Sequence, residues 1–131
     1  MVLTLAEANR IAAGAIERAE ALGIKINVAI CDAGGRPVAF QRMDGAMWAG
    51  AYGSQGKAVA SAAFARPSGG LTERADHPTF RGIHAAEGAH MIMGQGAVPI
   101  FRGDELIGAC GVGGGTGEED EDCARAGVER L

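Results

Sequence analysis

Two histidines around a glutamate form the pattern in this 131-residue chain best suited to chemistry. His84, Glu87 and His90 recur at every third residue in the segment HAAEGAH. Imidazole and carboxylate groups bind metal ions and move protons. On a helix the two imidazoles would point about 120° apart, because a helix has 3.6 residues per turn. His84 and His90 are therefore candidate metal ligands and His84 a candidate catalytic residue, although surface histidines are also common.

Lys57 is the second candidate, because it is one of two lysines and interrupts the small, apolar stretch AYGSQGKAVASAA. Its amine could bind a carboxylate or carry out covalent chemistry. The alternative is structural: the aliphatic stem lies along apolar surface and the ammonium reaches water. Arg42 and Arg66 are further cations that could hold an anion, while each could equally serve a turn or a helix end.

Composition narrows the class of protein. The net charge is −4, and no basic stripe interleaved with aromatic residues indicates a nucleic-acid partner. No apolar run approaches the roughly 20 residues that a membrane span needs, and the first residues lack a secretory pattern. The 3 cysteines fit neither a disulfide framework nor a Cys-x-x-Cys metal site. We expect a cytoplasmic protein with reduced thiols and no nucleic-acid or membrane partner.

The abundance of glycine is the unusual feature of the composition. The chain has 22 glycines but only 1 tryptophan, 1 tyrosine and 4 phenylalanines. A single domain spanning 1–131 is expected from this length. A core of small side chains buries little area per residue, so we expect identical subunits to bury more by forming a homo-oligomer.

Hydrophobic periodicity predicts helices and two hairpins. Pro67 ends the second helix, because a residue before proline avoids helical geometry. The expected elements are a helix over 4–23, a hairpin over 24–45, a helix over about 46–65, an irregular segment over 67–96 with a short helix around 80–90, a hairpin over 97–114 and a helix over 116–131. This order predicts an α+β domain with an antiparallel sheet covered by helices.

The glycine-rich segment GACGVGGGTGEEDED raises the question of a phosphate site. Thr116 and Glu119 have the spacing of a capping box, and the acidic run over 118–122 already supplies the negative charge that a helix N-terminus favours. A phosphate there would meet carboxylates and no lysine. We therefore expect a capped helix with a solvated acidic first turn.

Two segments carry a resemblance to a known family. DAGGRPVAFQRMDG and GAVPIFRGDELIGACGVGGGTGEEDEDCARAG resemble the two signature blocks of the GlcG/HbpS-like family, small bacterial heme-binding and heme-degrading proteins that include PduO C-terminal domains. The first helix and the Gly56–Ala58 segment also match, whereas 67–96 matches least. Gly114 and Glu119 depart from the serine and glutamine common there. The resemblance implies a three-layer α/β/α domain and oligomeric assembly.

Heme binding is the function that this resemblance implies. Heme requires an apolar slot, an axial ligand and cations for its propionates. The candidate heme-binding residues are His84, His90, Met43, Lys57, Arg42 and Arg66. Met91 and Met93 could also line a slot, although methionine commonly fills gaps in a core. Trp48 and Tyr52 could stack on a flat ligand, but we expect Trp48 in the core.

Two hypotheses of function follow. The first is a heme-binding protein that sequesters or degrades heme. The alternative is an enzyme acting on a small carboxylate, such as a keto acid or an aromatic ring-cleavage product. In that case Lys57, Arg42 and Arg66 bind the acid and a histidine moves protons.

Overall fold

The computed structural model describes residues 2–131. The elements in chain order are α1 (Leu5–Leu22), β1 (Asn27–Asp32), β2 (Pro37–Arg42), α2 (Ala49–Phe64), the 3-10 helix η1 (Ser68–Arg74), α3 (Pro78–Ala86), β3 (Ala97–Arg102), β4 (Glu105–Gly113) and α4 (Gly117–Val128). The predicted helix–hairpin–helix and hairpin–helix order is confirmed. The segment expected to be irregular contains η1 and α3.

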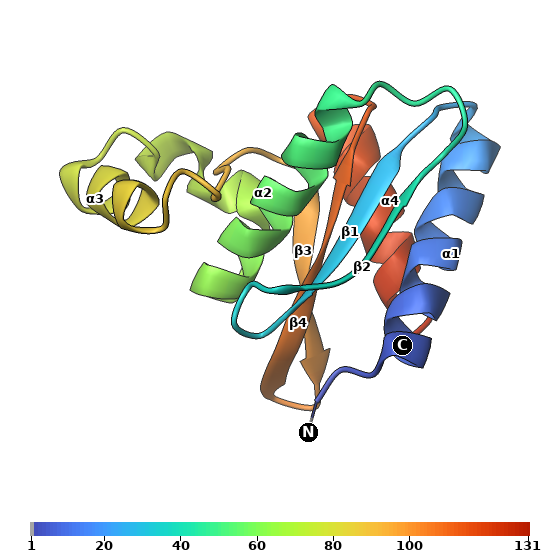
Figure 1. The fold of residues 1–131 in the computed structure, drawn as a ribbon, viewed down its shortest axis with the longest axis horizontal. Helices are drawn as coiled ribbons and strands as arrows, with labels where there is room; N and C mark the ends of the chain where they lie inside the picture. The colour runs from blue at the N-terminus through green and yellow to red at the C-terminus, as the bar shows by residue number, and fades with distance from the viewer. Residues whose placement is uncertain (1) are drawn as a thin grey trace.

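One antiparallel sheet with the strand order β2-β1-β4-β3 forms the middle layer. Helix α2 packs against β1 and β4 on one face, whereas α1 and α4 pack together on the other. Figure 1 shows the sheet between these two layers, with α3 extending beyond α2. The predicted α+β class and three-layer arrangement are confirmed.

Capping boxes start both helices of the α1/α4 layer. The backbone N–H of Glu7 donates to the hydroxyl of Thr4, and the N–H of Glu119 donates to that of Thr116, while each glutamate carboxylate accepts a hydrogen bond from the backbone N–H of the cap residue. Gly23 ends α1 with a φ of 73°, which favours glycine. The capping box predicted at Thr116 and Glu119 is confirmed.

The α1/α4 side of the sheet contains a sealed core. Branched side chains from the strands, including Val28, Ile30 and Ile100, meet small and branched residues of the two helices. Each fully buried side chain of this size stabilises the fold by about 1.5–3 kcal/mol.

The α2 side of the sheet is built from much smaller residues. In the β1–β4 register Ala29 lies opposite Gly111 and Cys31 opposite Ala109. A side chain on Gly111 would collide with the Ser54 carbonyl oxygen of α2. The absence of side-chain bulk therefore brings the backbone of α2 against the sheet.

The ends of α2 differ from the sequence-based expectation. The helix begins at Ala49 and ends at Phe64, and Ala65 follows in the left-handed region with a φ of 54°. Trp48, expected in the core, is 67% exposed, because it precedes the helical turns that meet the sheet. Phe64 stacks on Phe80 at 5.0 Å between ring centroids and joins α2 to α3.

No helix within residues 2–131 combines the length and apolar character needed to cross a membrane.

Candidate ligand-binding site

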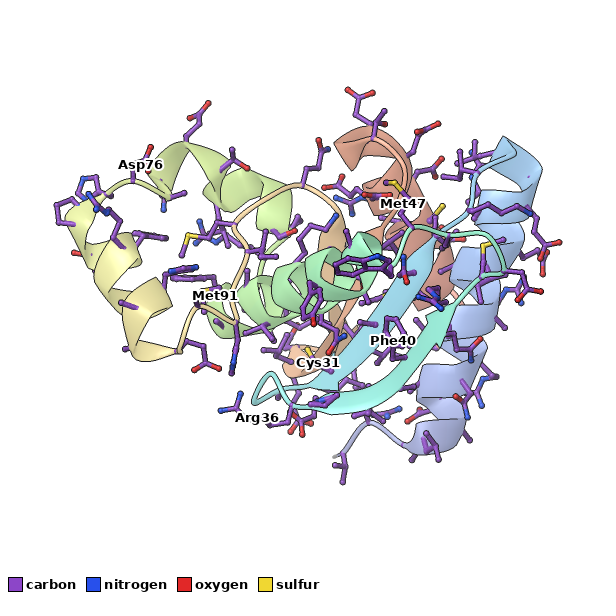
Figure 2. The ribbon with its side chains drawn as sticks, turned by 45° about the horizontal axis from the view of Figure 1, so that its top comes forward. Cys31, Arg36, Phe40, Met47, Asp76 and Met91 are labelled. Carbon is purple, nitrogen blue, oxygen red and sulfur yellow. The ribbon has the colours of Figure 1, made fainter. Side chains whose placement is uncertain are left out.

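A cavity of about 760 Å³ opens on the α2 side of the sheet. Its floor is the β1–β2 hairpin, one wall is α2, and the other is the segment that follows α3. Small-molecule sites typically measure about 300–1,000 Å³. Figure 2 shows Cys31 and Phe40 on the hairpin beside α2, and Arg36 at the hairpin turn.

The floor of this cavity is apolar and almost flat. Ala29 pairs with Phe40 across the hairpin, so both side chains point towards α2. Cys31 lies next to them, and its thiol donates a hydrogen bond of 3.5 Å to the carbonyl of Ala58. Burial raises the pKa of Cys31 to about 12. The floor therefore presents a neutral thiol and no thiolate at neutral pH.

A close contact between Ile92 and Gly56 holds the opposite wall in place. The Ile92 N–H donates to the Gly56 carbonyl at 2.9 Å. A Cβ on Gly56 would lie 2.5 Å from Cγ1 of Ile92. Glycine is therefore required at this point of α2 if the segment before β3 is to lie directly on the helix.

His90 is the histidine that lines the cavity. It follows Gly88 and Ala89, whose φ values of 73° and 64° turn the chain back after α3. The imidazole side chain is exposed, and it precedes the Ile92 contact by two residues. The turn thus brings an imidazole from the irregular segment to an apolar cavity.

Charged and aromatic residues surround this apolar floor. Arg36 donates from Nη1 to Oε1 of Glu87 at 3.0 Å, joining the hairpin turn to the end of α3. Tyr52 lines the cavity and meets Trp48 edge-on, with 6.2 Å between ring centroids. Both aromatic rings are largely exposed; Tyr52 is available to a ligand in the cavity, whereas Trp48 lies outside the cavity lining.

Lys57 does not line this cavity. Its ammonium donates to Oδ2 of Asp120 at 3.1 Å and to the carbonyl of Gln95 at 3.3 Å. The two paired side chains are only 10% and 4% exposed. The other Asp120 oxygen accepts the Gly115 N–H at 2.8 Å. Burial raises the pKa of Asp120, an effect that the charge of Lys57 partly offsets.

This pair corrects the expectation of a wholly solvated acidic turn. Asp120 lies on the same stripe of α4 as Cys123, Ala124 and Gly127, all of which are buried. Lys57 extends past Gly96 to reach it, so the ion pair links α2 to α4 across the two sides of the sheet.

The comparisons with known proteins agree with this architecture. A family model described as "Haem degrading protein HbpS-like" matches residues 3–129. The chain belongs to the HbpS-like family. An uncharacterized 15.0 kDa protein from the dhaT-dhaS intergenic region of Citrobacter freundii is 26% identical over 119 residues, which cover 90% of this chain and 84% of that protein.

Solved structures with the HbpS-like fold superpose closely. Protein ORFY of Klebsiella pneumoniae gives a TM-score of 0.89 at 26% identity, covering 98% of this chain and 89% of its own. A double mutant of HbpS from Streptomyces reticuli gives 0.88 at 27% identity, covering 100% and 88%. A PduOC:heme complex gives 0.88 at 24% identity, covering 100% and 96%, and this likeness concerns the fold.

In this HbpS-like chain the sequence-predicted site residues do not converge. Met43 lies on the sealed side of the sheet, where its sulfur accepts the Ile26 N–H at 3.3 Å. Arg42 ends β2 and Arg66 follows α2, and both are exposed outside the cavity lining. His84 is half-buried on α3, also outside that lining. Of the six candidate heme-binding residues only His90 lines the cavity, together with Tyr52, the candidate for stacking on a flat ligand.

The H-x-x-E-x-x-H spacing does not form a metal cluster. Helix α3 ends at Ala86, so His84 and His90 lie on different elements. Within residues 2–131 no group of 3 or more histidine, cysteine or acidic side chains is arranged to hold a metal ion.

Three cavity residues were missing from the sequence-based set: Arg36, Glu87 as an ion-pair partner, and Phe40. The signal for Arg36 was its place directly after the DAGG turn, at the tip of a hairpin. The signal for Phe40 was strand alternation, which places it on the same face as Ala29. Nothing in the sequence indicated that Glu87 would reach the hairpin.

Proposed function

We propose that this HbpS-like protein binds heme in the cavity between the β1–β2 hairpin, α2 and the segment after α3, where the imidazole of His90 would hold the iron. The observation that carries the proposal is an imidazole at the edge of a cavity of about 760 Å³ with an apolar floor. Membership of a family described as haem-degrading supports the choice of ligand, as does the heme complex of PduOC, which has the same fold.

The residues of the cavity suit a flat aromatic ring. Ala29, Ala58 and Gly56 leave space above the hairpin, while Phe40 and Tyr52 supply aromatic surface. Because Cys31 is a neutral thiol at neutral pH, His90 is the stronger iron donor in this set. When bound, heme would supply the iron chemistry. The protein would bind the ring, hold an imidazole against it and exclude water from one side.

A hemin titration followed in the Soret region tests the proposal. We expect a saturable shift at a fixed stoichiometry for the wild-type protein and the loss of that shift in His90→Ala. His77→Ala provides the matched control, since His77 is exposed before α3 and outside the cavity lining. A spectrum in which His84→Ala, rather than His90→Ala, abolishes the shift would assign the iron-binding imidazole to α3 instead.

Heme degradation is the second candidate function, favoured by the description of the matching family. It is tested by adding a chemical reductant to the aerated hemin complex and following the loss of the Soret band. Faster loss than for free hemin, dependent on His90, would support degradation. An unchanged rate would leave the protein as a heme-binding protein.

The small-carboxylate enzyme stays a prediction of the sequence. Its proposed cations are dispersed, because the Lys57 ammonium pairs with Asp120 and the two arginines lie outside the cavity lining. A variant such as Lys57→Met is therefore expected to affect stability before it affects any ligand.

Assembly into a homo-oligomer is also part of the proposal. Met47 and Trp48, which lie outside the cavity lining, are 68% and 67% exposed. Exposed apolar clusters of this kind often mark protein interfaces. Sedimentation velocity of the purified protein measures the state directly, and a monomer at all concentrations would contradict this part.

A further inference from the structure

The ion pair between Arg36 and Glu87 forms part of the cavity lining. Among the described residues that line the cavity, Arg36 carries the one permanent positive charge and Glu87 the one negative charge. Their side chains come from the hairpin turn and from the end of α3, and Nη1 lies 3.0 Å from Oε1. A ligand entering the cavity therefore meets a cation already bound by a carboxylate of the protein.

The backbone of Arg36 is held by the turn itself. The Asp32 carboxylate accepts the N–H groups of Gly34 and Arg36 at 2.9 and 3.0 Å. The Arg36 carbonyl accepts the Asp32 N–H at 2.9 Å. Gly35 has a φ of 78° and packs beside Val59 of α2. The guanidinium is thus presented from a short, internally bonded turn.

The backbone of Glu87, on the opposite side of the ion pair, is also held by hydrogen bonds and packing. Its N–H donates to the Ile83 carbonyl at 3.0 Å and so ends α3. The contact between Ile92 and Gly56 fixes the segment that follows. Glu87 also lines a smaller neighbouring cavity of about 120 Å³ below the hairpin turn. Glu87 consequently lines both spaces, so there is room for its carboxylate outside the ion pair.

We propose that Arg36 is the carboxylate-binding residue of the cavity, and that Glu87 is an internal competitor that a ligand's carboxylate displaces. The ligand class this selects is a flat apolar ring bearing a carboxylate. The proposal rests on the proposed function, because it assigns one end of the ligand whose ring occupies the same cavity.

Exchange of one carboxylate for another explains how such a site could work. A guanidinium has five N–H donors in a planar fork that matches a carboxylate. Glu87 accepts one hydrogen bond from Nη1, whereas a ligand carboxylate can accept two from the guanidinium fork, so the exchange gains about one charge-assisted hydrogen bond. Glu87 is partly exposed, and its released carboxylate can be hydrated. A neutral ring has no group to replace Glu87, so it gains nothing at Arg36.

Three porphyrin probes separate this carboxylate contact from iron ligation: hemin, hemin dimethyl ester and iron-free protoporphyrin. Their binding is followed by quenching of Trp48, the one tryptophan of the chain, which contacts Tyr52 at the cavity. Arg36→Gln should weaken hemin and protoporphyrin by about tenfold, the value of one charge-assisted hydrogen bond. It should leave the ester unchanged, whereas Arg36→Lys should give an intermediate loss.

The surface pair Arg125–Glu121 on α4 supplies matched controls. Its side chains are 56% and 20% exposed, compared with 65% and 29% for Arg36 and Glu87, and neither residue lines the cavity. Arg125→Gln should therefore bind all three probes as the wild type does. Glu87→Gln should tighten hemin about two- to fivefold, because the competing pair is worth about as much as an exposed ion pair, while Glu121→Gln should not.

The outcomes distinguish this inference from the proposed function. Equal affinity for hemin and its dimethyl ester, together with wild-type hemin binding by Arg36→Gln, would overturn the role of Arg36 and leave heme binding intact. Weaker hemin binding by Glu87→Gln would overturn the proposal that Glu87 competes with the ligand carboxylate for Arg36. If none of the three probes binds the wild-type protein, the proposed function fails and this inference fails with it.

Discussion

The two sides of the sheet use the same four strands for different purposes. Towards α1 and α4 the strands present branched residues such as Ile100 and Val112, which are buried against the two helices. Towards α2 they present Ala29, Cys31 and Gly111, and a cavity remains beside the helix. Because side chains alternate along a strand, one sheet can supply a stabilising core on one side and a binding site on the other.

The Lys57–Asp120 pair belongs to neither side alone, and breaking it should have the largest effect on stability. Asp120→Ala leaves a buried ammonium without its carboxylate, which costs about 3–5 kcal/mol. Urea unfolding measures the loss. Asp122→Ala is the matched control, because Asp122 pairs with Arg18 on the surface and such pairs contribute about 0–1 kcal/mol.

A double variant makes this test sharper. Lys57→Met combined with Asp120→Leu removes both charges, so it should recover most of the stability lost in Asp120→Ala. Equal losses in the single and double variants would mean that packing, rather than the buried charge, explains the effect.

Truncation of the sealed core should separate stability from binding. Ile100 is fully buried on the α1/α4 side, and Ile100→Ala should cost about 2–5 kcal/mol. The hemin affinity of the folded protein, measured well below its Tm, should stay within about twofold of the wild type, because Ile100 lies on the other side of the sheet. A large loss of affinity would show that the two sides are coupled.

Replacing each of two glycines of α2 by alanine should change the stability of the protein in opposite directions. Gly56→Ala drives a methyl group into Ile92, which should cost about 1–3 kcal/mol and weaken hemin binding by displacing the segment that carries His90. Gly53 has open space around its Cβ position. Gly53→Ala should therefore stabilise the protein by about 0.5–1 kcal/mol. Thermal unfolding of the two variants measures both changes in Tm. Equal changes in Tm for Gly56→Ala and Gly53→Ala would contradict the close contact at Ile92.

The smallest expected effect is the acid dependence of the α1/α4 layer. The Thr4 backbone N–H and the Arg102 guanidinium lower the pKa of Glu7 from 4.5 to about 2. The stabilisation from ionised Glu7 is therefore fully present above pH 4.5 and is lost as the pH falls from there to about 2. Glu7→Gln should flatten the Tm profile across this window.

Glu20→Gln is the charge-matched control for that profile, since Glu20 is exposed on the same helix. If Glu7→Gln and Glu20→Gln change the profile equally, the capping box and the Arg102 contact do not account for the acid sensitivity.

The periodic parts of the chain could be predicted from the sequence because local and tertiary preferences agree there. The capping boxes at Thr4 and Thr116, the turn at Gly103–Asp104 and the strand alternation all follow from short-range chemistry. Cys123 is fully buried in the structure, and this burial, together with the acidic neighbours that the sequence shows, raises its pKa to about 11.

The site was harder to predict because it depends on contacts between distant segments. The Arg36–Glu87 contact spans 51 positions and begins in a turn. The acidic neighbours of Asp120 in the sequence predict a side chain exposed to solvent. Its position three residues before Cys123 and seven before Gly127 placed it on the buried stripe of α4. The helical period therefore predicts the burial of Asp120 better than the charge of its neighbours does.

The most direct test of the account is the hemin titration of wild-type and His90→Ala proteins, with His77→Ala beside them. We expect a saturable Soret shift with one hemin per cavity, which is lost in His90→Ala and kept in His77→Ala. A wild-type response that does not saturate, or one that His90→Ala leaves unchanged, would contradict the claim that the α2 side of the sheet is a heme site centred on His90.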